Sequence, residues 1–444
     1  MSFSFSRRDF PNDFIFGVAT AAYQIEGSKF GNCGSSHWDT WSETPGNVHN
    51  SDNGSIACDH SNRFYDDLDI IKSGGFDSYR FSTSWSRVMP DGKSVNSEGL
   101  DFYDRLVDGM IARGLKPNLT LYHWELPSYL ADIGGWTNRD IAERFAEFTD
   151  VIINRIGDRI DHTATINEPW CVAWLSYFLG GQAPGIRDIR AAVRAMHHVM
   201  LAHGKALEVL KSHGQSNLGI VLNLGHGEAA SNTQADINAT KTFDAIHTRW
   251  FMDSLFKGNY PKDMLSKVEK YMPENFESDM KLISSPIDWL GVNYYTRGVI
   301  KAAPNEPWPH FEGEEGVLPK TQMGWEIYPE GLELLLKRIY NDYTNEIPIM
   351  ITENGMANED VVSNDICDDP IRVKYFEDHL QAVIRCIAYG VPVKGFFGWS
   401  LLDNYEWAYG YEKRFGLVHV DYETQKRTPK ASFKAFQKAI SGNQ

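Results

Sequence analysis

IPIMITENG, at residues 347–355, is a short apolar run that turns polar at its end. The stretch 369–389 that follows has apolar residues at a period of about 3.6, which is typical of an amphipathic helix. Asp369 can cap this helix, Pro370 suits its first position and Gly390 lies just past its end. The sequence therefore predicts a strand followed by a helix, which is the unit of parallel α/β folds.

The same pattern recurs along the rest of the chain. A second helix is predicted at 100–113, before Gly114. Strands alternating with helices predict the α/β class and a (β/α)₈ TIM barrel, in a single domain over residues 1–444. A doubly wound open sheet is the alternative, but its usual Gly-rich turn (GxGxxG) does not occur. The other predicted strands are FIFGVATA (14–21), FDSYRFSTSW (76–85), KPNLTLYHW (116–124), HTATINEP (162–169), NLGIVLNLG (217–225), IDWLGVNYY (287–295) and VKGFFGWSLLD (393–403).

Most of these runs turn polar at the C-terminal end. In a TIM barrel these ends meet at one mouth, where the loops after the strands build the active site. We therefore expect the site there. The polar and aromatic residues at or beyond the strand ends are Gln24, Arg80, His123, Trp124, Asn167, Glu168, Asn293, Tyr295, Glu353, Asn354, Trp399, Glu406 and Trp407.

Two carboxylates, Glu168 and Glu353, end the fourth and seventh predicted strands. Glycoside hydrolysis needs such a pair: one protonates the leaving oxygen while the other attacks the anomeric carbon or activates water. Two neighbouring carboxylates resist double ionisation, so we expect the pKa of Glu168 to be raised. For either residue alone, a salt bridge is the simpler interpretation.

The composition and the net charge limit which kinds of partner are expected. The net charge is −16, which disfavours nucleic acid and anionic membranes as partners and leaves an oligomer possible. Five cysteines without a CxxC pair suggest neither a disulfide framework nor a zinc knuckle. The start, MSFSFSRRDFPNDF, has no apolar signal segment, so a cytoplasmic location is expected.

A metal site is not expected. His197, His198 and His203 cluster in one helical stretch, but no two are three or four residues apart, so a packing or helix-surface role is favoured. Neither HExxH nor GxSxG occurs, which leaves zinc protease and serine hydrolase chemistry without support. We expect a reaction that needs no cofactor and no metal.

Beyond these patterns, the chain resembles glycoside hydrolase family 1, the β-glucosidase family, over nearly its whole length. The segments that carry the resemblance include GVATAAYQIEG (17–27), LYHWELP (121–127), TINEPW (165–170), LGVNYYT (290–296), ITENG (351–355) and GWSLLDNYEWAYGY (398–411). The resemblance implies that Glu168 is the acid/base and Glu353 the nucleophile of a retaining double displacement. It also implies that Asn167 binds the sugar 2-hydroxyl.

The resemblance assigns further residues to substrate binding. Arg80 and Tyr295 would orient Glu353, with Asn293 close by. Trp325 would form a platform for the leaving group, although a packed loop tryptophan fits it equally well. The residues implied to hold the other sugar hydroxyls, with Trp124 beside them, are Gln24, His123, Trp399, Glu406 and Trp407.

Two positions narrow the chemistry within the family. Thioglucosidases of the plant type replace the acid/base by Gln, whereas Glu168 is kept here. The 6-phospho-β-glucosidases replace the Glu of NxEW, whereas Glu406 is kept and would repel a 6-phosphate. The chain departs mildly from the family at Glu125, where Asp is usual, and at Tyr405, where Phe is usual.

The sequence thus predicts a β-glucosidase that acts on the terminal non-reducing β-D-glucosyl residues of cello-oligosaccharides or on aryl or alkyl β-glucosides. Three alternatives remain open. The main activity can be that of a β-galactosidase or β-fucosidase, or the chain can be a catalytically silent carbohydrate-binding relative. A barrel enzyme of other chemistry, such as an aldolase, would need a strand-end Lys, which none of the predicted strands has.

Overall fold

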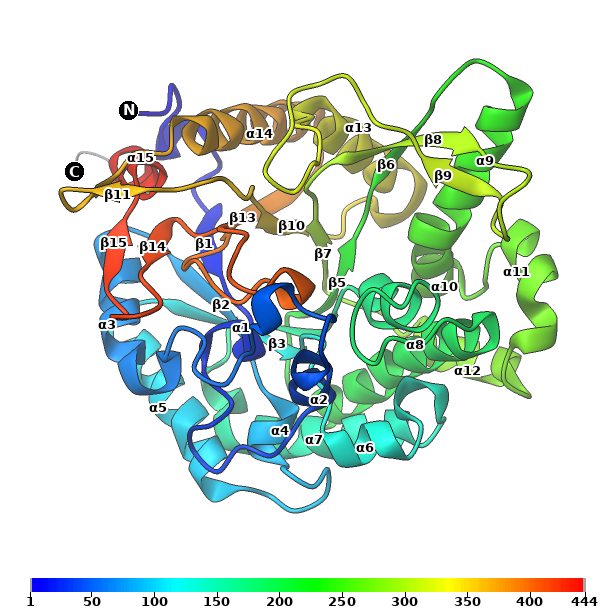
Figure 1. The fold of residues 1–444 in the computed structure, drawn as a ribbon, viewed down its shortest axis with the longest axis horizontal. Helices are drawn as coiled ribbons and strands as arrows, with labels where there is room; N and C mark the ends of the chain where they lie inside the picture. The colour runs from blue at the N-terminus through cyan, green and yellow to red at the C-terminus, as the bar shows by residue number, and fades with distance from the viewer. Residues whose placement is uncertain (1, 442–444) are drawn as a thin grey trace.

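Eight parallel strands close into a barrel at the centre of the computed structural model, which describes residues 2–441 (Figure 1). Neighbours in the chain pair with one another, and the last strand closes on the first, with Ile15 opposite Gly395 and Ala19 opposite Trp399. The TIM-barrel prediction is confirmed. The barrel strands are β1 (Ile15–Ala19), β2 (Ser78–Ser82), β3 (Lys116–Tyr122), β4 (His162–Asn167), β5 (Leu218–Asn223), β7 (Trp289–Asn293), β10 (Ile349–Asn354) and β13 (Val393–Trp399).

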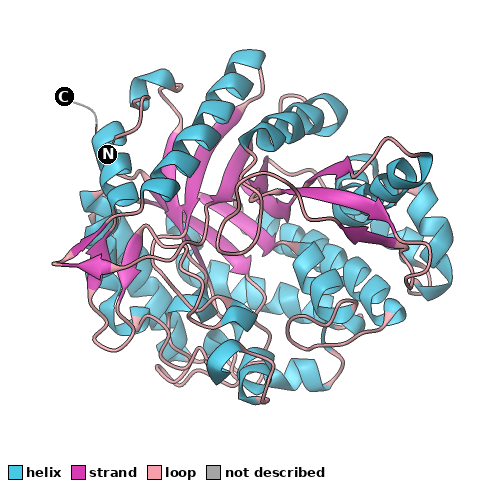
Figure 2. Cartoon of the chain, turned by 45° about the horizontal axis from the view of Figure 1, so that its top comes forward, coloured by secondary structure: helices cyan, strands magenta, loops and turns pink. Residues whose placement is uncertain are grey.

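Helices cover the outside of the barrel (Figure 2). The α-helices are α1 (Ala22–Ile25), α2 (His37–Glu43), α3 (His60–Ser73), α4 (Trp85–Val88), α5 (Ser97–Ala112), α6 (Ser128–Asp132), α7 (Ile141–Ile156), α8 (Ile189–Ser212), α9 (Gln234–Asp244), α10 (Trp250–Lys257), α11 (Lys262–Val268), α12 (Phe276–Ile283), α13 (Pro329–Ile339), α14 (Pro370–Tyr389) and α15 (Ala431–Ile440). In residues 2–441, no helix is both long and apolar enough to cross a membrane.

Short strands and single helical turns lie in the loops between the main elements. Three small sheets are formed by β6 (His226–Ala229) with β8 (Arg297–Ala302) and β9 (Phe311–Gly313), by β11 (Val362–Ser363) with β12 (Ile366–Cys367), and by β14 (Val418–Val420) with β15 (Arg427–Pro429). The first of these projects from one side of the barrel beside α9 (Figure 1). Single wide turns of π-helix occur at η5 (Cys171–Leu175), η6 (Ala245–Arg249) and η8 (Tyr340–Thr344).

Each barrel strand lies within the run predicted for it, and the predicted helices correspond to α14 and α5. Pro370 is the first residue of α14, and Gly390 ends it with φ 109°. The prediction that the Asp369 side chain caps this helix is wrong. Asp369 occupies the N-cap position, but its carboxylate accepts hydrogen bonds from Arg372 and from Ser432, which lies 63 residues further along the chain.

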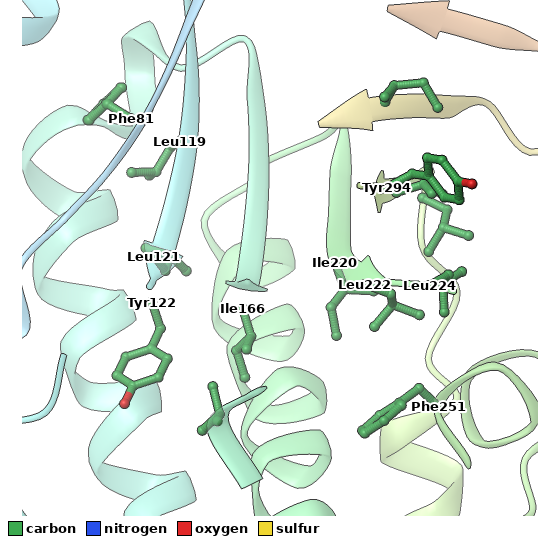
Figure 3. Packing of buried hydrophobic residues seen from close by; sticks show 14 of the residues in the cluster. Phe81, Leu119, Leu121, Tyr122, Ile166, Ile220, Leu222, Leu224, Phe251 and Tyr294 are labelled. Atoms are coloured by element: carbon green, nitrogen blue, oxygen red, sulfur yellow. The ribbon is translucent and has the colours of Figure 1, made fainter. Parts of the chain in front are cut away.

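Side chains of the barrel strands alternate between two apolar clusters, as the two-residue period of a strand requires. Val221 of β5 packs inside the barrel, whereas its neighbours Ile220 and Leu222 belong to the larger core under the helices (Figure 3). The inner cluster fills the barrel below the strand ends, so the C-terminal mouth is built on a packed floor. Its strand members are Ile15, Ala19, Ala164, Val221, Trp289, Met350, Phe397 and Trp399.

The histidine cluster of α8 has a packing role. His197 contacts the Tyr260 hydroxyl at 2.8 Å and Asp279 at 2.9 Å, and all three histidines are buried. His203 contacts Thr165 on β4 at 2.7 Å, and His198 contacts the Trp136 carbonyl. The His203 contact joins α8 to the barrel, and the other contacts join α8 to α12 and to the segments that carry Tyr260 and Trp136.

Candidate active site

The predicted site residues come together at the C-terminal mouth of the barrel. Some are the last residues of strands or directly follow them, and others stand in the loops beyond. They are Gln24 on α1, Arg80 on β2, His123 and Trp124 after β3, Asn167 and Glu168 at the end of β4, Asn293 and Tyr295 at the end of β7, Glu353 on β10, Trp399 on β13, Glu406 and Trp407 beyond it, and Trp325 before α13.

Glu353 is held by a cation and a phenol. Arg80 Nη1 donates to Glu353 Oε1 at 2.7 Å, and the Tyr295 hydroxyl donates to Oε2 at 2.7 Å. Burial raises the pKa of Glu353, while the Arg80 guanidinium and these hydrogen bonds oppose the rise. Both oxygens are thus fixed by donors that favour the carboxylate form.

Glu168 has a different environment, because the donors that contact it are neutral. Asn293 Nδ2 donates to Oε1 at 2.6 Å and the Cys171 thiol donates to Oε2 at 3.1 Å, and the side chain is buried. Burial raises the pKa of Glu168, and the nearby charge of Glu353 raises it further. Both causes act in the direction that the sequence predicts for this pKa.

One hydrogen-bond network joins the two carboxyl groups. Arg80, which holds Glu353, also donates through Nη2 to Asn167 Oδ1 at 2.8 Å. Asn293, which holds Glu168, donates to the same Asn167 oxygen at 3.1 Å. The two glutamates therefore belong to a single site. They are not two separate surface salt bridges, which was the alternative interpretation for each residue alone.

The backbone is irregular where both glutamates leave their strands. The register of β4 against β5 shifts between Ala164 and Asn167, and that of β10 against β7 shifts between Ile351 and Glu353. Such irregularities re-aim side chains next to active sites. Glu168 also has φ 52°, in the left-handed region, a conformation that costs on the order of 1–3 kcal/mol and concentrates at functional sites.

A third carboxyl group lies across the mouth. Gln24 Nε2 donates to Glu406 Oε2 at 3.3 Å and to the Tyr405 carbonyl at 2.9 Å. Burial raises the pKa of Glu406 to about 8, with the charge of Glu353 as the next cause. Gln24 Oε1 is buried and has no partner among the described residues, so it can accept a hydrogen bond from a bound hydroxyl.

Four aromatic side chains pack against one another at the mouth. The His123 ring is parallel to within 13° with the rings of Trp399 and Trp407, at 5.7 and 6.1 Å. Trp124 lies 4.9 Å from Trp407, and its indole nitrogen donates to the Asn167 carbonyl. Burial holds the pKa of His123 well below its usual range, so the imidazole is neutral. Polar groups beside flat apolar faces suit a sugar, which has hydroxyl edges and a C–H face.

Trp325 stands at the edge of the site. Its ring lies 5.5 Å from Tyr295, the partner of Glu353, and 6.2 Å from Phe415. The strand-end residue Asn354 is turned away, because its amide donates to the Tyr294 carbonyl and to the Tyr375 hydroxyl on α14.

Four residues of the site were not singled out from the sequence. Thr352 donates to Asn293 Oδ1 at 2.7 Å, and Asn404 Oδ1 accepts from Gln24. Cys171 contacts Glu168, and Asn223 donates to the Cys171 sulfur at 3.4 Å. Asn223 is the last residue of β5, so a polar strand end was also present in the fifth predicted strand.

Comparisons with known proteins identify relatives over nearly the whole chain. The family model described as "Glycosyl hydrolase family 1" matches residues 6–444. A protein of Thermotoga neapolitana named 1,4-beta-D-glucan glucohydrolase is 45% identical over 98% of this chain and 99% of its own length. A Bifidobacterium breve protein named bifunctional beta-D-glucosidase/beta-D-fucosidase is 40% identical over 97% of this chain and 98% of its own.

A solved structure has the same fold. The structure titled "Family 1 b-glucosidase from Thermotoga maritima" superposes with a TM-score of 0.94 at 45% identity, and the match covers 97% of this chain and 98% of that one. The match to the family model over nearly the whole chain, together with these full-length relatives, establishes the family. The chain belongs to glycosyl hydrolase family 1.

Proposed function

We propose that this glycoside hydrolase is a retaining β-glucosidase with Glu353 as nucleophile and Glu168 as acid/base. The observation that carries the proposal is the contrast between two buried carboxyl groups in one network: Arg80 contacts Glu353, whereas neutral donors contact Glu168. We further propose that the substrates of this enzyme are terminal β-D-glucosyl residues of cello-oligosaccharides or of aryl and alkyl β-glucosides. The names of two relatives, 1,4-beta-D-glucan glucohydrolase and b-glucosidase, support a β-glucoside as the substrate.

The reaction proceeds in two displacements at the anomeric carbon. Glu353 forms a bond to that carbon as the bond to the leaving oxygen breaks, and Glu168 gives its proton to that oxygen. In the second step, Glu168 takes a proton from water, whose oxygen attacks the anomeric carbon. The ester bond to Glu353 breaks, and the sugar leaves with its β configuration retained.

The electrostatics of the pair suit both steps. The negative charge of Glu353 helps to keep Glu168 protonated before the first step. Once Glu353 is esterified, its charge is gone, and one cause of the raised pKa of Glu168 disappears with it. Glu168 is then a stronger acid, stays ionised after giving up its proton, and can act as the base.

The pH dependence follows from these roles. Activity needs Glu353 ionised and Glu168 protonated, so kcat/KM falls at low pH as Glu353 gains a proton and at high pH as Glu168 loses one. Because burial raises the pKa of both groups, both limbs are expected above the ordinary pKa of a glutamic acid. A profile of kcat/KM measured on p-nitrophenyl β-D-glucoside checks this, and a flat profile between about pH 4 and 9 contradicts the assignment.

The other predicted residues would hold the sugar. One N–H of Asn167 contacts His123 at 3.3 Å, and the second is available to the 2-hydroxyl. Gln24, His123 and Glu406 would bind the remaining hydroxyls, with Trp399, Trp407 and Trp124 packing beside the ring. Trp325 would receive the leaving group, and its position beside Tyr295 supports this.

Glu406 is expected to select for an unphosphorylated sugar. Replacing Glu406 by Ser exchanges a carboxyl group, whose two oxygens would bind sugar hydroxyls, for a single shorter hydroxyl group, so kcat/KM for p-nitrophenyl β-D-glucoside should fall by about 10²-fold or more. The ratio of kcat/KM on p-nitrophenyl β-D-glucoside to kcat/KM on its 6-phosphorylated form should fall at the same time. Rates on both substrates check this, and an unchanged ratio of the two would show that Glu406 does not face the 6-position.

A β-fucosidase or β-galactosidase activity is the second candidate, and the Bifidobacterium relative's bifunctional name favours it as a companion activity. A panel of p-nitrophenyl β-glycosides decides between them. We expect β-glucoside turnover to dominate. A larger kcat/KM on β-fucoside or β-galactoside would reverse the order, and no turnover of any member would favour a carbohydrate-binding role.

We further propose that residues 1–444 form one catalytic domain, that cellulose-derived oligosaccharides are among the substrates, and that the enzyme acts in the cytoplasm. The family match over residues 6–444 supports the first. The free state of the five cysteines supports a reducing compartment. Fractionation of the source cells, with the activity assayed in each fraction, tests the location.

A further inference from the structure

A thiol lies against the acid/base glutamate. Cys171 opens the π-helical turn η5, three residues after Glu168, and its Sγ is 3.1 Å from Glu168 Oε2. The side chain is 6% exposed. The two-step reaction described above gives this thiol no part, although it donates one of the hydrogen bonds that Glu168 receives.

A residue from a different barrel strand holds the thiol in place. Asn223, the last residue of β5, donates from Nδ2 to Cys171 Sγ at 3.4 Å. Burial and the neighbouring Glu168 raise the pKa of Cys171 well above its usual range, so the sulfur keeps its proton. The bonds therefore run in one direction, from the Asn223 amide to the sulfur and from the thiol proton to Glu168.

We propose that Cys171 is a positioning residue that, oriented by Asn223, fixes the Glu168 carboxyl group for its proton transfers. Asn293 holds Oε1 from β7 and Cys171 holds Oε2 from η5, so two donors from different elements set the plane of the carboxyl group. The inference rests on the proposed role of Glu168 as acid/base. Because a thiol donor favours the ionised carboxyl group, it also assists the step in which Glu168 acts as a base.

The other groups that act on Glu168 stay in place when Cys171 is changed. Glu353 is the neighbouring negative charge that raises the pKa of Glu168, and Arg80 is the neighbouring positive charge that lowers it. Glu406 is a further carboxyl group near this pair, and its own pKa is raised to about 8. Tyr295 and Asn293 complete the surroundings from the end of β7. A change in the titration of Glu168 in a Cys171 variant can therefore be assigned to the lost donor.

The test is the pH profile of kcat/KM on p-nitrophenyl β-D-glucoside for Cys171→Val and Cys171→Ser. Valine fills a similar space without a donor, so the basic limb should move up by about 0.5 pH unit, from the typical strength of one neutral hydrogen bond. Cys171→Ser keeps a hydrogen-bond donor, so its basic limb should lie close to the wild-type position. Asn223→Ala should move the basic limb in the same direction as Cys171→Val, but by a smaller amount.

A second readout separates positioning from packing. On an alkyl β-glucoside, whose departure needs protonation, Cys171→Val should lower kcat/KM several-fold. On 2,4-dinitrophenyl β-D-glucoside, whose leaving group departs without a proton, it should change kcat/KM little. The matched control is Cys386→Val, a buried cysteine on α14, which should leave the profile unchanged.

The inference is overturned if Cys171→Val lowers kcat/KM by the same factor on both glucosides while the basic limb stays in place. It is also overturned if Cys386→Val moves the basic limb as far as Cys171→Val does. Glu168→Gln distinguishes this from a failure of the proposed function. If Glu168→Gln abolishes the basic limb while Cys171→Val leaves it unmoved, only the positioning role falls. If the limb persists in Glu168→Gln, the acid/base assignment falls and the positioning role falls with it.

Discussion

Replacing Glu353 by Ala is expected to lower turnover of p-nitrophenyl β-D-glucoside on the order of 10⁵-fold, because no other group can form the glycosyl ester. The space that the carboxylate vacates admits a small anion. Azide should therefore restore part of the rate and give α-glucosyl azide, since a single displacement inverts a β substrate. Initial rates with and without azide, and the configuration of the product by NMR, measure both effects.

The control for this variant is Glu353→Gln. Glu353→Ala leaves the buried Arg80 without its partner ion, which destabilises the fold, whereas Gln keeps the shape and one acceptor oxygen. Gln should be equally inactive and should not respond to azide, because it leaves no space. Near wild-type turnover in folded Glu353→Ala protein would exclude Glu353 as the nucleophile.

Replacing Glu168 by Ala should give a loss that depends on the leaving group. A general acid contributes about 10²–10⁴-fold, and a leaving group that departs as a stable anion does not need it. We expect a loss of about 10³-fold or more in kcat/KM on an alkyl β-glucoside and little loss on 2,4-dinitrophenyl β-D-glucoside. Rates across aryl and alkyl glucosides of graded leaving-group pKa measure this dependence.

Azide should also speed turnover of Glu168→Ala, but with β-glucosyl azide as the product. Here the anion attacks the glycosyl ester on Glu353 and needs no base, so two inversions restore the β configuration. Glu168→Gln is the matched variant that keeps the size of the side chain. An equal loss on all leaving groups, or an α product, would contradict the acid/base role.

Most of the barrel could be predicted because its strands are short apolar runs with polar ends. The run 347–355 predicted β10, and the same rule placed Asn167 and Glu168 at the end of β4. Parallel strands covered on both faces give this signal directly. The strand ends come together because the sheet closes into a barrel. Eight alternating strand–helix units predict that closure.

The errors and omissions depend on contacts between distant parts of the chain. Asp369 has the sequence signature of a cap, but Ser432 and Arg372 bind its oxygens instead. Cys171 contacts Glu168 from the first position of a π-helical turn, and Asn223 reaches Cys171 from another strand. The contact between Asn223 and Cys171 spans 52 residues, which no local period predicts. Glu168 and Cys171 are only three residues apart, but Glu168 directly follows a strand, so a helical spacing was not expected there.

The residue pattern by itself did not show the environment that distinguishes the two glutamates, and only the family resemblance implied Arg80 and Tyr295 beside Glu353. The register shifts before Asn167 and Glu353, and the left-handed backbone of Glu168, exist only in the folded barrel. The residue pattern could therefore indicate a pair of carboxylates, while the contacts of each one are seen only in the three-dimensional arrangement.

Trapping the intermediate tests the central claim most directly. The protein is incubated with a 2-deoxy-2-fluoro-β-D-glucoside that carries a good leaving group, which forms the glycosyl ester but slows its hydrolysis, and is then digested for peptide mass spectrometry. We predict one 2-deoxy-2-fluoroglucosyl group per chain, attached to Glu353, and none in Glu353→Gln. Attachment to another residue, or full turnover without any labelled peptide, would contradict the double displacement through Glu353.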